Sequence, residues 1–362
     1  MIVLPFLFHT PNIGRGIRAQ ASAAVIGRAD IGPDCTLGAL AVVRADGEAV
    51  RIGTDCWFGA ASTVHIAHLL YPSIVGNHVT VGRYGLVHAC TIGDDCVIGE
   101  HAAVMDGAVL GAGAVVAAQS IVPPGKQLAG GWLYAGTPAR PVAPVSAEAL
   151  AQLHRALREG APIGAAAATA ETIHATPPLA DLHHPPGTGA AGQFPAGTYL
   201  APTASVVGAV ALGERTSLWF GTEIDAGEAR VEIGTETNVQ DNSRLYAGAA
   251  GQDLLIGARV LIGHNVRIFA SSIGAGAIIG MGASVGPGTV VEPGGCVAAG
   301  SVTEPGTVVR SGEVWSGRPA RAARALSEAN RSAFAAGVMT YVEYCAQYLD
   351  PRQRNAAKPS LR

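Results

Sequence analysis

Residues 91–122 read TIGDDCVIGEHAAVMDGAVLGAGAVVAAQSIV, and this stretch decides the fold. An aliphatic residue returns at every sixth position, and a glycine or another small or polar residue usually follows it. The aliphatic positions are Ile92, Ile98, Val104, Leu110, Val116 and Val122. A six-residue period matches neither the period of a helix, about 3.6 residues, nor the two-residue alternation of an ordinary strand.

This period predicts a triangular solenoid. Each hexapeptide would form one short strand and one corner, so that three hexapeptides make one coil. The aliphatic residue points into the prism, and the small residue after it lets the chain turn. The coils would stack through β-ladder hydrogen bonds with a spacing of about 4.8 Å.

The same pattern runs through both halves of the chain. In the first half the corners run from Ile26 to Val122, and in the second half from Val207 to Thr303. Each corner of the second series is the matching corner of the first plus 181, since 207 − 26 and 303 − 122 both give 181. The two copies align without a gap, including their loops, so the chain is predicted to hold two tandem copies of one solenoid domain.

Helical sequence follows each solenoid. Ser146–Gly160 begins like a capped amphipathic helix, and a longer helix is expected over Leu326–Leu349. Residues 161–197 are rich in Ala, Pro, Gly and Thr and are interpreted as a linker, with His174, His183 and His184 as solvated residues. The tail after Asp350 is expected to be disordered. The predicted domains are residues 1–145 (first solenoid), 146–197 (helix and linker), 198–321 (second solenoid) and 322–362 (helix and tail).

Composition excludes several classes of function. The chain has 362 residues, 48 glycines and a net charge of −3, without any run of Lys or Arg, which argues against nucleic-acid binding. Its opening residues lack a basic region and are interrupted by Pro5, so we expect a strand there and not a signal peptide. No apolar run is long enough to cross a bilayer. The six cysteines form no CxxC pair, which favours buried thiols in a reducing cytoplasm.

Two stretches of each copy carry the candidate chemistry. In the second copy residues 217–246 read SLWFGTEIDAGEARVEIGTETNVQDNSRLY and residues 261–283 read LIGHNVRIFASSIGAGAIIGMGA. In the first copy residues 42–67 read VVRADGEAVRIGTDCWFGAASTVHIA and residues 79–99 read VTVGRYGLVHACTIGDDCVIG. Both copies resemble the γ-class carbonic anhydrases, hexapeptide-repeat proteins with an R-G-D element, an N-x-Q-D element and three histidines. The resemblance implies left-handed parallel β-helices, and a zinc ion bound by two histidines of one prism and one of its neighbour.

The first copy keeps one part of this pattern. It has Arg44 and Asp46 of the R-G-D element and the histidines His65 and His88. Arg83 stands where the resemblance places the third histidine. The resemblance implies that Arg44 holds the interface or the product, paired with Asp46 of a neighbouring prism.

The second copy keeps the complementary part. Its retained residues are Asn238, Gln240, Asp241 and His264. Tyr246 and Phe269 replace the other two histidines. Corners three steps apart share a prism face, so Arg44, His65 and His88 should stack on one face, and Gln240 and His264 on a different face. We therefore predict one composite site, with His65, His88 and His264 as metal ligands. Random loss of residues in two decaying copies is the alternative.

The resemblance implies a zinc lyase of carbonic anhydrase type, with ferrous iron or cobalt(II) as alternative metals. A metal-bound hydroxide would attack CO2 or a related carbonyl carbon. Gln240 would orient the hydroxide, Asn238 and Asp241 are further catalytic candidates, and His68 is a candidate proton shuttle. CO2, bicarbonate or another small carbonyl compound would be the ligand, in a cytoplasmic homo-oligomer without nucleic acid or membrane partners.

Three alternatives remain open from the sequence. The same fold and metal could act on a thioester or a biosynthetic intermediate. The chain could be a non-catalytic scaffold, because fold alone does not define function. A hexapeptide acyltransferase is a weaker alternative, since the N-x-Q-D element is not its signature.

Overall fold

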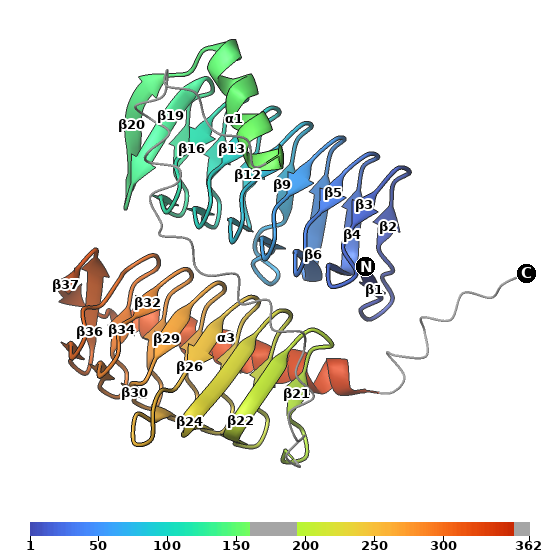
Figure 1. Ribbon diagram of the computed structural model, residues 1–362. Helices are drawn as coiled ribbons and strands as arrows, with labels where there is room; N and C mark the ends of the chain where they lie inside the picture. The colour runs from blue at the N-terminus through green and yellow to red at the C-terminus, as the bar shows by residue number, and fades with distance from the viewer. Residues whose placement is uncertain (160–193, 351–362) are drawn as a thin grey trace, which may run out of the picture. The chain divides into compact units, whose positions relative to one another are not determined.

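The computed structural model describes residues 1–159 and 194–350. These residues fall into two compact units, one on each side of the gap. Each unit is a left-handed parallel β-helix followed by an α-helix, as the period and the resemblance predict (Figure 1). The linker histidines His174, His183 and His184 and the tail after Asp350 lie outside the described residues.

The first unit is built from twenty short strands. Their bounds are β1 (Ile2–Leu4), β2 (Asn12–Ile13), β3 (Arg18–Ala19), β4 (Ala24–Ile31), β5 (Thr36–Leu37), β6 (Val42–Ile52), β7 (Trp57–Phe58), β8 (Thr63–His65), β9 (Ser73–Val75), β10 (Thr80–Val81), β11 (Leu86–His88), β12 (Thr91–Ile92), β13 (Val97–Ile98), β14 (Ala103–Val104), β15 (Val109–Leu110), β16 (Val115–Val116), β17 (Ile121–Val122), β18 (Gln127–Leu128), β19 (Trp132–Gly136) and β20 (Ala139–Pro144). One sheet has the order β17-β14-β11-β8-β6-β9-β12-β15-β18, so that the long β6 spans two prism faces. The third face has the order β20-β19-β16-β13-β10-β7-β5-β3.

The second unit repeats this plan. Its strands are β21 (Tyr199–Leu200), β22 (Ser205–Leu212), β23 (Ser217–Leu218), β24 (Glu223–Ile233), β25 (Asn238–Val239), β26 (Arg244–Tyr246), β27 (Leu254–Ile256), β28 (Leu261–Ile262), β29 (Arg267–Phe269), β30 (Ser272–Ile273), β31 (Ile278–Ile279), β32 (Ser284–Val285), β33 (Val290–Val291), β34 (Cys296–Val297), β35 (Val308–Val309), β36 (Glu313–Gly317) and β37 (Ala320–Ala325). One sheet has the order β32-β29-β26-β24-β27-β30-β33-β35, and the other β21-β23-β25-β28-β31-β34-β36-β37.

The predicted shift of 181 residues holds strand by strand. β6 and β24 differ by 181 at both ends, since 223 − 42 and 233 − 52 give the same number, and every other strand of the second unit has such a counterpart. The prism interior explains this conservation of register. Most corner residues, among them Val81 and its counterpart Ile262, are buried in two separate cores. The predicted corner Val207 is an exception, because it is half-buried and its neighbour Val206 packs against the core instead.

Glycine is required where one corner packs against the next coil. A Cβ atom added to Gly99 would lie 2.5 Å from the backbone nitrogen of Ala118. Such a contact is closer than real side chains tolerate, so glycine at this corner is a packing requirement as well as a turn residue.

Each unit ends in an antiparallel hairpin and a helix. β19 pairs with β20, and β36 with β37, in antiparallel register. Helix α1 (Ala147–Glu159) begins after Ser146, whose Oγ accepts from the amide of Ala149 at 3.1 Å. Helix α3 (Glu328–Leu349) begins after Ser327, whose side chain accepts from the amide of Asn330, so it starts two residues later than predicted.

The two helices are held by different chemistry. α1 buries Leu153 and Leu157 on the first prism, and Arg158 reaches the carboxylate of Asp55 at 3.3 Å. α3 packs its tyrosines, Tyr341, Tyr344 and Tyr348, around the indole of Trp219, with ring centroids 5.2–6.1 Å from it. The indole is fully buried, and its N–H donates to Ser217 at 3.0 Å.

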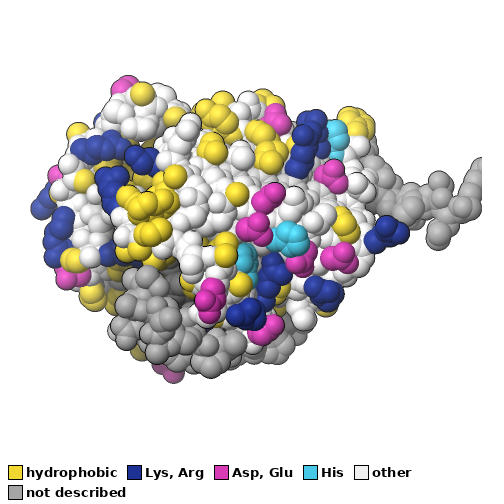
Figure 2. Space-filling view, turned by 90° about the horizontal axis from the view of Figure 1, so that it is seen from above, with side chains coloured by type: hydrophobic (Ala, Val, Ile, Leu, Met, Phe, Trp, Pro, Cys, Tyr) yellow, Lys and Arg dark blue, Asp and Glu magenta, His cyan; other side chains and the backbone are white. Residues whose placement is uncertain are grey.

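Thiols and charges follow the sequence-based expectations. All six cysteines are free and buried, and burial raises the pKa of Cys96 to about 12. Basic and acidic side chains both lie among apolar ones on the face that Figure 2 shows. Across residues 1–159 and 194–350, no helix is long and apolar enough to span a membrane.

Candidate metal half-sites

The first half-site lies on the face formed by β6, β8 and β11. His88 and His65 are direct neighbours across the β11–β8 ladder, and Arg44 precedes them on β6, whose Val43 pairs with Val64. All three side chains are buried. The two imidazole centroids are 5.4 Å apart with their planes at 71°. The structure thus confirms that Arg44, His65 and His88 stack on one face.

The backbone fixes the tautomer of His65. Its Nδ1 lies 2.8 Å from the carbonyl oxygen of Arg44. A carbonyl oxygen can only accept, so Nδ1 carries the proton in the neutral ring and Nε2 carries the lone pair. Ser73 holds the same strand end in place, because its Oγ donates to the carbonyl of His65 at 2.5 Å and accepts from the amide of Ala89 at 2.8 Å.

A carboxylate orients His88 in the same way. Nδ1 of His88 lies 2.6 Å from Oδ1 of Asp106, which follows β14 in the next coil. The carboxylate accepts from Nδ1, and Nε2 again carries the lone pair. Neither Asp106 nor Ser73 was singled out from the sequence. A signal existed for Ser73, because the second copy has Leu254 at the matching position (73 + 181).

Arg44 has a carboxylate partner within its own prism. Its guanidinium Nη1 lies 2.5 Å from Oδ2 of Asp46, and both side chains are fully buried. Residues two apart on one strand point to the same side, so this pair forms within β6. The pairing of Arg44 with Asp46 of a neighbouring prism, which the resemblance implies, stays a prediction.

The second half-site lies on a different face, formed by β25 and β28. Gln240 donates from Nε2 to Oδ1 of Asn238 at 3.1 Å. Oδ1 of Asp241 accepts from the amide of Phe220 at 3.0 Å, and its Oδ2 lies 3.1 Å from Nδ1 of His264. Gln240 and His264 lie on the predicted face. However, His264 lies against Asp241 and not directly beside Gln240. The backbone register causes this, because the amide of Asn265 donates to the carbonyl of Asp241.

The donor chemistry of these imidazoles fits a metal ion. In each of the three rings Nδ1 is turned towards an oxygen of its own prism. Histidines that bind metals usually donate their second ring nitrogen to a carboxylate or carbonyl, which raises the basicity of the ligating nitrogen. Zinc accepts such neutral imidazole nitrogens readily.

The lost ligand positions carry side chains that contact neighbours in their own prism. Arg83 donates to Glu100 at 2.8 Å with its side chain 57% exposed. In the second unit Tyr246 and Phe269 stack with centroids 5.6 Å apart. Other histidines of the first prism lie outside its half-site. His68 is half-buried after β8, His78 lies 3.1 Å from Asp55, and His101 stacks on Tyr84.

The hexapeptide coils, which carry imidazoles at the ends of their strands, define the class of this protein. It is a hexapeptide-repeat β-helix protein. A family model described as "Hexapeptide repeat of succinyl-transferase" matches residues 90–122. Protein YrdA of Escherichia coli (strain K12) is 37% identical over 158 residues, which are 42% of this chain and 86% of that protein. The mitochondrial Gamma carbonic anhydrase 2 of Arabidopsis thaliana is 35% identical over 135 residues, 36% of this chain. This match spans about half (49%) of the plant relative.

Among solved structures, a hexapeptide transferase family protein from Anaplasma phagocytophilum is 34% identical with a TM-score of 0.41. The alignment covers 43% of this chain and 92% of that one. The chain belongs to the γ-class carbonic anhydrase-like family of hexapeptide-repeat proteins.

Proposed function

We propose that the chain is a γ-carbonic anhydrase-like metalloenzyme with one composite metal site, in which His65 and His88 of a first prism and His264 of a second prism hold the ion. The observation that carries the proposal is the matching state of the three imidazoles. Nδ1 of His65 and of His88 is hydrogen-bonded to an oxygen of its own prism, and Nδ1 of His264 lies 3.1 Å from the Asp241 carboxylate. This arrangement favours Nε2 as the nitrogen that offers its lone pair to a metal.

A zinc ion held by His65, His88 and His264 would supply Lewis-acid chemistry, because zinc lowers the pKa of a coordinated water to about 7 and so would make hydroxide available at neutral pH for CO2 or a related carbonyl carbon. Ferrous iron or cobalt(II) are alternative occupants of the same ligand set.

Gln240 and Asn238 have the groups needed to orient the reacting water. Their mutual hydrogen bond uses the Gln240 amide N–H and the Asn238 carbonyl oxygen. Oε1 of Gln240 and Nδ2 of Asn238 are buried and have no hydrogen-bond partner among residues 1–159 and 194–350. One acceptor and one donor are therefore available, and buried polar atoms of this kind are costly unless a ligand satisfies them. In the proposal Oε1 accepts the proton of the water.

The other candidate residues take supporting roles. Asp241 and Asp106 position His264 and His88 through their Nδ1 atoms. Arg44 positions His65 through its carbonyl oxygen, while its guanidinium is engaged by Asp46. His68 is proposed as the group that carries protons to solvent, because it is half-buried and follows the β8 ligand strand.

Metal analysis of the purified full-length chain tests the proposal, together with CO2 hydration followed by a pH indicator. We expect at most one zinc, iron or cobalt ion per chain, and loss of both metal and activity in His88→Ala. The matched control is His78→Ala, since His78 is a histidine of the same prism with its side chain 55% exposed. Two ions per chain would contradict the composite site.

A non-catalytic scaffold is the second candidate, favoured by the packed replacements Arg83–Glu100 and Tyr246–Phe269 at the lost ligand positions. Absence of metal from protein purified without chelators would favour it. Metal without CO2 hydration would instead point to another carbonyl substrate of the same site.

A further inference from the structure

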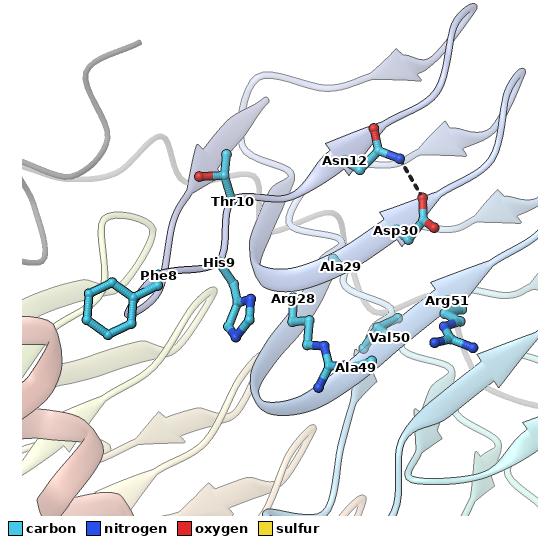
Figure 3. A pocket seen from close by; sticks show the side chains of 10 residues that line it. All are labelled: Phe8, His9, Thr10, Asn12, Arg28, Ala29, Asp30, Ala49, Val50 and Arg51. Carbon is cyan, nitrogen blue, oxygen red and sulfur yellow. Dashed lines mark hydrogen bonds between the residues drawn. The ribbon is translucent and has the colours of Figure 1, made fainter. Parts of the chain in front are cut away.

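A pocket of ≈ 390 Å³ lies at the N-terminal end of the first prism (Figure 3). Its polar lining residues are His9, Thr10, Asn12, Arg28, Asp30 and Arg51. None of them belongs to either metal half-site. The pocket is therefore a separate feature of the first unit, built from its first coils.

The stacking of coils brings these side chains together. Asn12 on β2 pairs with Asp30 on β4, and Asp30 with Arg51 on β6. Gly27 has a positive φ of 72°, and the β4–β6 register shifts between Gly27 and Ala29, so Arg28 leaves the regular ladder at this bulge. His9, Arg28 and Arg51 extend towards the same side in the view of Figure 3.

The charge of the pocket is unbalanced. Neither Arg28 nor Arg51 forms an ion pair within the part of the chain that the structure describes, whereas Arg83 and Arg158 of the same prism pair with carboxylates. The one carboxylate of the lining, Asp30, accepts a hydrogen bond from Asn12 at 2.8 Å. The lining therefore contains two guanidinium groups and one carboxylate.

The second prism shows that the fold does not need these charges. It has the same bulge, where Gly208 has a φ of 86°. The positions matching Arg28, Asp30 and Arg51 (plus 181) are Ala209, Ala211 and Glu232. The same backbone thus exists without either arginine, and the cationic pocket is an addition specific to the first copy.

We propose that this pocket binds the oxyanion group, phosphate or carboxylate, of a small organic molecule. The guanidinium fork matches both groups in a bidentate manner. Thr10 and His9 supply further donors, and Ala49 and Val50 line the pocket with apolar surface. The volume lies within the range of small-molecule pockets, about 300–1,000 Å³, and exceeds what a bare inorganic anion fills.

Calorimetric titration of the full-length chain tests this site, with inorganic phosphate and succinate as the two probes and chloride at matched ionic strength as the reference. We expect saturable binding of at least one probe. Binding of phosphate alone would assign a phosphate ester, and binding of succinate alone a carboxylate ligand.

Arg28→Ala and Arg51→Glu should each weaken that binding about tenfold or more, because a charge-assisted hydrogen bond is lost. Arg51→Glu copies the residue of the second prism, so the fold should tolerate it, and circular dichroism checks this. The control is Arg140→Ala, an exposed arginine at the other end of the same prism, which should bind as wild type. Absence of saturable binding, or equal binding in both pocket variants and the control, would overturn the proposal. Neither readout depends on the metal site.

Discussion

The two prisms have the same backbone and opposite site residues. Their strands coincide after a shift of 181 residues, yet the first keeps the histidines of the β6–β8–β11 face and the second keeps the residues of the β25–β28 face. Inward corner residues are constrained by the narrow core, since each touches residues of neighbouring coils. Residues at the strand ends and turns are not constrained by the core, so their identities indicate which face still has a role. The difference teaches that loss of site residues followed the faces and not the fold.

The largest expected effect comes from removing one imidazole from each copy. His88→Ala and His264→Ala should each lower metal affinity and activity by at least about 100-fold, more than the loss of a residue that only orients a ligand. The double variant should be no worse than either, because ligands of one site act as a unit. Metal content and CO2 hydration are the measurements. Full activity in both single variants would rule out a shared site and break the comparison.

Mixing the two single variants locates the site within or between chains. If it forms between chains, a mixed assembly can pair an intact first prism with an intact second prism and recover partial activity. If it forms within one chain, mixing recovers nothing, since every chain carries one damaged half. Wild-type protein mixed with each variant provides the reference.

A smaller effect compares the carboxylates of the two half-sites. Asp106→Asn and Asp241→Asn should each weaken metal binding about 10–100-fold. The introduced asparagine side chain would orient the imidazole less well than the carboxylate does, and it would raise the basicity of the ligating ring nitrogen less. Competition with a chelator of known affinity measures this. The control is Asp55→Asn, whose carboxylate lies 3.1 Å from His78 outside both sites. Unchanged affinity in either site variant would show that its histidine is not a ligand.

The helices provide a comparison of stability. Trp219→Ala should destabilise the second prism by about 3–5 kcal/mol, because it empties the centre of the aromatic cluster under α3. Leu153→Ala under α1 should cost about 2 kcal/mol, at the low end for a leucine, since this side chain lies on a small surface cluster. Urea unfolding followed by circular dichroism gives both values. Trp132→Ala is the tryptophan control, being 38% exposed, and an equal loss there would contradict the assignment.

The smallest expected effect is a pH-dependent contribution to stability from Asp55, whose carboxylate pairs with Arg158 of α1. Burial of the Asp55 carboxyl raises its pKa, but hydrogen bonds from His78 and Arg158 and the charge of Arg158 outweigh this and lower the pKa. A carboxyl with a lowered folded-state pKa stabilises the fold above its unfolded pKa, about 3.9, and that contribution is lost as pH falls through the folded value. The side chain is 41% exposed, so solvent screening limits the effect to less than about 1 kcal/mol.

The Tm difference between wild type and Asp55→Asn measures this contribution. It should be present at pH 7, begin to shrink near about pH 3.9, and vanish only as the pH falls through the lower folded-state pKa. The contacts of Trp219 with the tyrosines of α3 are aromatic, so Trp219→Ala should show a difference that does not change with pH over this range. A pH-independent difference for Asp55→Asn would show that the carboxylate charge contributes nothing.

The sequence predicted the coils because inward positions must repeat, as with Ile52 and its counterpart Ile233. It also predicted which face carries each histidine, since the face follows from counting corners. It could not predict Asp106 as the partner of His88. Asp106 follows the strand that lies beside β11, and the period does not encode where such turn side chains point. The contact between Arg44 and Asp46 inside β6 follows from strand geometry, whereas the resemblance alone places a partner for Arg44 in another prism.

The closing hairpins have a consequence for how long these solenoids can grow. A parallel β-helix ends in a row of unpaired amides and carbonyls, which could template further coils or another chain. β20 and β37 are the outermost strands of their sheets, and they run antiparallel to the coils. β20 carries Pro141 and Pro144, which cannot donate to a further strand, and β37 carries the exposed charges of Arg321 and Arg324. Each copy therefore blocks fibre-like extension by its own means, and an added coil should be accepted between existing coils but not beyond the hairpin.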